Sequence, residues 1–143
     1  ADVLCELAAL PFASNSTGSS NHLAGELLKT MAGIDMVHVP YKSASGASVD
    51  VMGGRVSMMF DNVTTAVPLV KAAKLRAIAV TGDKRIAALP DVPTMVEQGY
   101  AGFEAISWQA VLAPAKTPKP IIDRLVNELV RVVKSDAVRT KLK

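Results

Sequence analysis

Hydroxyl-bearing and small residues gather in three short stretches of the sequence, and these stretches have the clearest capacity for chemistry. They are Ser14–Ser20, Pro40–Ser45 and Asp61–Thr65. Each one follows a short apolar run and precedes a segment with helical periodicity. A helix start presents unpaired N–H groups and a partial positive charge. The three stretches therefore have the composition of a seat for a carboxylate or a phosphate.

The candidate ligand-binding residues share a position where the chain is expected to leave a strand and enter a helix. They are Ser14, Gly18, Ser19, Ser20, Tyr41, Asp61 and Asn62. Serine and asparagine at such positions are also ordinary helix caps, so both interpretations stay open. The first stretch is neither a Walker A motif nor a dinucleotide fingerprint, because it lacks the Gly-Lys-Ser/Thr ending of the one and the later glycines of the other.

Groups suited to catalysis are few. His38 lies in an apolar run and is expected in the core, whereas His22 at a helix start can orient the serine stretch by a hydrogen bond or act as a general base. A hydrolase with Ser19 or Ser20 as nucleophile and His22 as base is the alternative, but no third group is apparent. Cys5 has no evident partner, and no residues show metal-ligand spacing. We therefore predict no catalytic residue, no metal and no cofactor.

Composition excludes several classes of function. The 143 residues are half hydrophobic, and the 16 basic and 13 acidic residues give a net charge of +3. The basic residues are scattered without interleaved aromatics, so no nucleic-acid partner is expected. No stretch reaches the roughly 18 apolar residues of a membrane span, so direct membrane insertion is not expected either.

Short apolar runs alternate with amphipathic segments over the first half of the chain. Strands are predicted over 10–13, 36–39, 56–60 and 75–80, and helices over 22–32, 44–52 and 64–73. This β-loop-α pattern predicts an α/β fold with a mostly parallel sheet flanked by helices. Ligands of open α/β sheets bind beyond the carboxyl ends of the strands, so the three polar stretches are expected side by side at one rim.

The pattern changes after Val80. A polar loop over 82–93 and a helical turn over 94–98 lead to a predicted strand over 103–113, which holds Trp108 as a pocket wall or a core residue. A proline-rich linker follows, and then the clearest helix of the chain over 121–134. Its apolar residues recur with the helical period: Ile122, Leu125, Leu129, Val132 and Val133.

An ordered series of motifs resembles the tripartite tricarboxylate transporter receptor family, also called Bug-type solute-binding proteins. The resemblance covers about Ala13 to Leu142. In chain order the blocks are Ser19–Leu27, His38–Lys42, Asp50–Val56, Met59–Asn62, Leu75–Thr81, Arg85, Ala88–Thr94, Glu97, Gly99, Gly102–Glu104, Trp108 and Leu112–Pro114.

The resemblance implies a periplasmic-binding-protein-like fold (type II) with two α/β domains and a ligand in the cleft between them. The chain would then hold a ligand-binding domain over 10–80, a crossover over 81–102 and the C-terminal part of the other domain over 103–143. By position, Ser14, Gly18, Ser19 and Ser20 match the family's serine–glycine ligand loop, and Asp61 and Asn62 match a third cleft-facing loop. Tyr41 is a candidate from the loop pattern alone.

The function implied is that of an exported, periplasmic receptor, not an enzyme. Such a receptor binds a small di- or tricarboxylate or an amino acid and delivers it to membrane transporter subunits. A carboxylate-sensing regulatory domain is an alternative with the same chemistry.

Two departures from the family pattern affect what this chain can do. Ser16 stands where the first glycine of the family's Ser-x-Gly-x-Gly-Ser is expected, and a side chain there can narrow the pocket. Family members are also about twice as long. The chain is therefore expected to be a fragment without a signal peptide and without the amino-terminal half of the first domain, to bind ligand weakly alone, and to self-associate through uncovered apolar surface.

Overall fold

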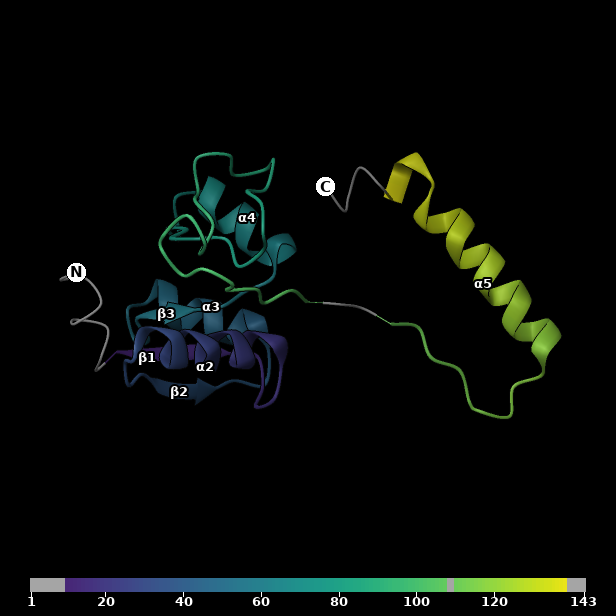
Figure 1. Cartoon of the computed structure of the whole chain (residues 1–143), viewed down its shortest axis with the longest axis horizontal. Coiled ribbons are helices and arrows are strands. Elements are labelled where there is room, and N and C mark those ends of the chain that lie inside the picture. Colours follow the sequence, from purple (N-terminus) through teal and green to yellow (C-terminus); the bar gives the residue numbers. More distant parts are fainter. Residues whose placement is uncertain (1–9, 108–109, 139–143) are drawn as a thin grey trace. The chain divides into compact units, whose positions relative to one another are not determined.

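The protein is seen here in a computed structural model that describes residues 10–107 and 110–138 (Figure 1). The chain divides into two compact units, Ala1–Ser107 and Trp108–Lys143. The predicted division into domains at 80/81 and 102/103 stays a prediction.

The first unit is built on a parallel sheet of three short strands. These are β1 (Pro11–Ser14), β2 (Val37–Pro40) and β3 (Met58–Met59), in the order β2-β1-β3. β1 pairs with both neighbours in parallel, with Phe12 opposite His38 on one side and Met58 on the other. The carboxyl ends of the three strands therefore lie at one edge, which confirms the predicted α/β class and parallel sheet.

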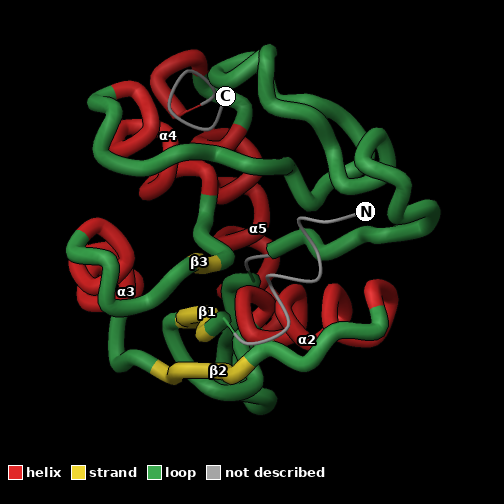
Figure 2. Tube along the Cα trace, turned by 90° about the vertical axis from the view of Figure 1, so that its left-hand side faces the viewer, coloured by secondary structure: helices red, strands yellow, loops and turns green. Residues whose placement is uncertain are grey.

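Two helices cover the two faces of this sheet, as Figure 2 shows for α2 (Ser20–Ala32) and α3 (Ala44–Met52). A third helix, α4 (Val63–Lys71), follows β3. α2 begins two residues before the predicted start because Ser19 has extended backbone and its side chain accepts a hydrogen bond from the His22 amide. It ends at Gly33, whose φ of 65° is left-handed.

Alternation along β1 creates two separate cores. Successive strand residues point to opposite faces, so Phe12 faces α2 and Ala13 faces α3. The buried cluster around Phe12 contains Leu28, Met36, Met95 and Phe103. The smaller cluster around Ala13 contains Ala47 and Val56. The sheet is thus covered on both sides, as its continuous apolar strands predict.

Three strand predictions were wrong in extent. The run 75–80 forms a single parallel bridge between Val80 and Thr94, because an apolar run becomes a strand only where a backbone partner runs beside it. Pro93 cannot extend that pairing, since it has no N–H. The third strand shrinks from 56–60 to two residues. The described residues of 103–113 carry no strand at all.

Side chains add to the few backbone hydrogen bonds that hold the segment after Val80. The Thr94 amide donates to Glu97 Oε2 at 2.7 Å, and the Glu97 amide donates to Thr94 Oγ1 at 3.1 Å. This reciprocal pair is a capping box, and it stabilises the single turn predicted over 94–98. Arg85 Nε donates to the same carboxylate at 3.0 Å. The turn places Met95 in the Phe12 cluster.

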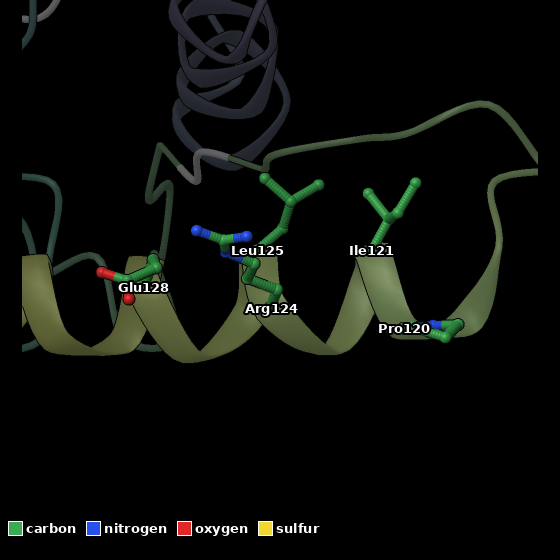
Figure 3. Close-up of a pocket in the computed structure, with 5 residues that line it drawn as sticks. All are labelled: Pro120, Ile121, Arg124, Leu125 and Glu128. Atoms are coloured by element: carbon green, nitrogen blue, oxygen red, sulfur yellow. The ribbon is translucent and has the colours of Figure 1, made fainter.

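The longest described helix of the second unit is α5 (Lys119–Val133). Its bounds agree within two residues with the helix predicted over 121–134. Within its own unit its apolar residues stay exposed: Ile121, Leu125, Val126, Leu129, Val130, Val132 and Val133. The groove in Figure 3 is lined by Pro120, Ile121, Arg124, Leu125 and Glu128. All five belong to this helix, so the groove is open surface and not an enclosed site. No helix in the described parts of the chain is long and apolar enough to cross a membrane.

Replacing Gly25 by alanine is expected to destabilise the first unit. A Cβ at Gly25 would lie 2.6 Å from Phe12 Cζ, much closer than the roughly 3.5–4.0 Å of an ordinary carbon–carbon contact. Such overpacking costs about 1–3 kcal/mol and outweighs the better helix propensity of alanine. Gly46→Ala in α3 is the matched control, since its Cβ would meet its nearest atom at 3.4 Å. Urea unfolding should show a lower midpoint for Gly25→Ala only; an equal or higher midpoint contradicts the packing.

The uncovered face of α5 is expected to make the chain self-associate. Exposed apolar area of this extent is unstable in water and favours burial against another surface. Leu125→Lys combined with Leu129→Lys should shift the chain toward monomer in sedimentation experiments. Asn127→Lys, on the polar side of the helix, adds the same kind of charge and should leave the association intact. A wild-type chain that stays monomeric at high concentration would contradict this expectation.

Candidate functional site

The Ser14–Ser20 loop, which follows β1, has a fixed internal structure. Ser14 is fully buried, and its hydroxyl donates to the Ser16 carbonyl at 2.9 Å. The Ser19 hydroxyl donates to the same carbonyl at 2.8 Å and accepts from the His22 amide at 3.3 Å. The capping interpretation is therefore confirmed for Ser19. It does not exclude anion binding, because the amides of Ser20 and Asn21 open α2 and have no acceptor within the helix.

Two histidines hold this loop. The Gly18 amide donates to His22 Nδ1 at 3.1 Å, which confirms the predicted contact between His22 and the serine stretch. His38 Nε2 lies 2.7 Å from Ser14 Oγ. The two rings are stacked with centroids 3.9 Å apart. Burial, and then the neighbouring His22, lower the pKa of His38, which favours the uncharged form of its ring.

The loop after β3 meets the first loop through a residue from a distant part of the chain. The Ser107 hydroxyl donates to Asn62 Oδ1 at 3.1 Å and lies 3.1 Å from Ser20 Oγ. A hydroxyl has one proton, so Ser20 is the donor in the second contact. Asn62 is free for this role because its side chain makes no capping bond to α4. The starts of α2 and α4 are therefore joined by three side chains.

Other contacts strengthen the same junction. Asn21 Nδ2 donates to the Phe60 carbonyl at 2.7 Å, which ties the first turn of α2 to the end of β3. Asp61 Oδ1 accepts from the Asn62 amide at 2.8 Å and from Thr65 Oγ1 at 2.7 Å. The positive ends of two helix dipoles thus meet at one edge of the sheet. This arrangement favours an anion between them.

Tyr41 lies beside the first loop but uses its hydroxyl elsewhere. Its amide donates to the Ser14 carbonyl at 2.9 Å, while its hydroxyl donates to Asp50 Oδ2 at 2.7 Å. Arg55 Nε donates to the other oxygen of Asp50 at 2.8 Å. The bond from Tyr41, and then that from Arg55, lower the pKa of Asp50. A direct ligand contact by Tyr41 stays a prediction, and its hydroxyl is already engaged.

Ser107 is the residue that the sequence did not single out. It lies in the segment predicted as a strand, and no helix follows it to mark a capping or anion-binding position. Two other residues that the sequence analysis discusses, Trp108 and Cys5, lie outside the described residues. Among the described residues, no group of three or more His, Cys, Asp or Glu side chains is placed to hold a metal ion.

A family model described as Tripartite tricarboxylate transporter family receptor matches residues 6–143. Among curated proteins, the chain is similar to the UPF0065 protein in the tcbD–tcbE intergenic region of Pseudomonas sp. strain P51. The two are 41% identical over 135 residues, which are 94% of this chain and 40% of the relative.

Solved structures share the fold. R. palustris Rpa4515 with adipate has a TM-score of 0.88 and 38% identity, covering 93% of this chain and 44% of that one. MatC from Rhodopseudomonas palustris with bound malate has a TM-score of 0.86 and 32% identity, and the match covers 93% of this chain and 45% of that one. The periplasmic binding protein BugD has a TM-score of 0.90 and 34% identity, and the match covers 99% of this chain and 48% of that one. This chain spans less than half the length of each of these relatives.

Tyr41→Phe is expected to change how stability depends on pH. A carboxyl whose folded-state pKa is lowered stabilises the fold above its ordinary value, here 3.8, and loses that contribution as the pH falls through the folded-state pKa. Without the phenol bond, the pKa of Asp50 moves back toward its ordinary value. Acid unfolding of the variant should therefore show a shallower loss of stability below pH 3.8 than the wild type does. Superimposable acid profiles would contradict the Tyr41–Asp50 bond.

Proposed function

Since this chain belongs to the tripartite tricarboxylate transporter receptor family, a family of non-enzymatic periplasmic solute-binding receptors, we propose that it is the ligand-binding part of a receptor for a small dicarboxylate. The observation that carries the proposal is the chain of contacts Ser20–Ser107–Asn62. Those contacts bring two helix starts and the serine loop to one edge of the sheet, where donors for an anion are concentrated.

The proposed binding mode uses neutral donors. One carboxylate is bound by the first amides of α2, which the contact from Ser20 to Ser107 helps to position, and the other end of the ligand lies toward Asn62 at the start of α4. Selectivity follows because a ligand that fails to reach one helix start leaves desolvated donors unpaired. Two relatives, one with adipate and one with malate, are dicarboxylate complexes, and this supports the ligand class.

A second lobe is part of the proposal. The relatives are more than twice as long as the matched region, and periplasmic binding proteins close two domains around the ligand. We therefore propose that this edge forms one wall of an interdomain cleft. Delivery to tripartite transporter subunits follows from the family and not from any feature of the described residues.

The hydrolase alternative lacks the contact that it needs. The Ser19 hydroxyl donates to a carbonyl, and His22 meets Ser19 through its backbone amide and not through its ring. His22 Nδ1 is already the acceptor of the Gly18 amide. Ser14 and His38 are in contact, but Ser14 is fully buried and its hydroxyl proton goes to the Ser16 carbonyl. The Ser19–His22 pair of the hydrolase alternative therefore lacks the contact between nucleophile and base that catalysis needs.

An NMR titration of the chain with adipate and with malate tests the proposal. The amide signals of Gly18, Ser20 and Asn62 should shift together with millimolar affinity, because one wall alone binds weakly. Ser20→Ala or Asn62→Ala should weaken binding by roughly threefold to tenfold, the worth of one hydrogen bond. Thr30→Ala, at the far end of α2, is the matched control, since its hydroxyl bonds only to the Glu26 carbonyl.

The neutral diamide of adipic acid serves as the ligand control and should cause no such shifts. Shifts that are absent with both dicarboxylates, or that appear away from the two helix starts, would contradict the proposed site.

A further inference from the structure

His22 and His38 hold the serine loop at two points, one in each half of it. His22 accepts from the Gly18 amide, and His38 lies against the Ser14 hydroxyl. The hydroxyl proton of Ser14 goes to the Ser16 carbonyl, so His38 Nε2 must be the donor to Ser14. The loop therefore depends on the protonation of two imidazoles in contact with each other.

His22 can accept the hydrogen bond from the Gly18 amide only if its Nδ1 carries no proton. A neutral imidazole has one acceptor nitrogen, whereas a protonated one has two donors and no acceptor. The Gly18 amide can donate to His22 only while the ring is uncharged, with its proton on Nε2. That nitrogen lies 3.7 Å from Glu26 Oε1. Protonation at Nδ1 would set two N–H groups against each other at Gly18.

The surroundings of the two rings differ. Glu26 and Lys29 of α2 face the rings from one side, and β1 contributes the uncharged Phe12, whose ring centroid lies 5.0 Å from that of His38. Two imidazolium rings stacked at 3.9 Å would repel each other strongly. The pKa of His38 is lowered by burial and by His22, while the side chain of His22 is 17% exposed and close to Glu26.

We propose that His22 and His38 are positioning residues for the proposed anion-binding site at the starts of α2 and α4. The Ser14–Ser20 loop has its binding-competent conformation only while His22 is uncharged. The proposal rests on the proposed function for its biological meaning, because it concerns the control of that same site. Imidazole is the side chain whose charge ordinarily changes between pH 5 and pH 8. Acidification of the surroundings would then release the Gly18 amide and, with it, the fixed direction of the first amides of α2.

The first experiment needs no ligand. Side-chain and amide NMR of the chain between pH 8 and pH 5 should show His22 with a proton on Nε2 at high pH, and a Gly18 amide that shifts and exchanges faster as His22 charges. His22→Asn places an amide oxygen near the position of Nδ1 and does not titrate. In that variant the Gly18 amide should stay protected throughout. The proposal would be overturned if the shift and the exchange rate of the wild-type Gly18 amide did not change as His22 becomes charged.

The second experiment measures adipate affinity across the same pH range. Wild-type affinity should fall by roughly threefold to tenfold more on acidification than that of His22→Asn, which corrects for protonation of adipate itself. His22→Ala should bind weakly at every pH, and His22→Asn should restore binding near neutrality. Identical pH profiles for the wild type and His22→Asn would overturn the proposal. Absence of adipate binding at any pH would instead count against the proposed function, while the ligand-free Gly18 result stays readable.

The partner ring has its own test. His38→Gln keeps an N–H near the position of Nε2 for Ser14, whereas His38→Ala removes it. The Gln variant should retain the ligand-free signature of the Gly18 amide and the Ala variant should lose it, although both lack the stacked ring. Equal behaviour of the two variants would assign His38 a packing role only and would remove it from the proposal.

Discussion

Helix α2 reaches the sheet at Gly25, where the helix backbone lies against the ring of Phe12 with no space for a side chain. This approach sets the height of the helix above β1. It also places His22 over His38, with the Phe12 ring centroid 6.4 Å from that of His22. The first turn of α2 consequently lies at the carboxyl edge of the sheet, where Asn21 bonds to the end of β3. A wider separation would break these polar contacts together.

Parallel strand order does the rest of the positioning. Because β1 lies between β2 and β3, the loops that leave all three strands are neighbours, although they are far apart in sequence. The helix starts add their amides without any side-chain charge. Ser107 then connects Ser20 to Asn62 across 45 residues or more of chain. The site is thus a property of topology, with only its final polar contacts contributed by individual side chains.

Local signals explain what the sequence predicted well. β1, β2 and α3 agree with their predicted bounds within one residue, since each is bounded by a proline, a glycine or a capping serine. The strand predicted over 75–80 was wrong because its pairing depends on tertiary structure. The run lies beside Pro93 and pairs with the backbone only at Thr94. Ser107 was missed for the same reason, because nothing in its local sequence announces which loops it will contact. The His22 contact was predictable, since it spans one helical turn.

An anion-binding site built from amides and hydroxyls gains its affinity differently from a site built from arginine side chains. Each neutral hydrogen bond contributes only about 0.5–1.5 kcal/mol in water, because water competes for the same donors. The donors become effective when water is excluded and the local dielectric falls. An open edge with neutral donors therefore gains most of its affinity from closure by a second wall. The absence of a cationic side chain from the described contacts of Ser20, Ser107 and Asn62 also makes the site sensitive to a single imidazole proton.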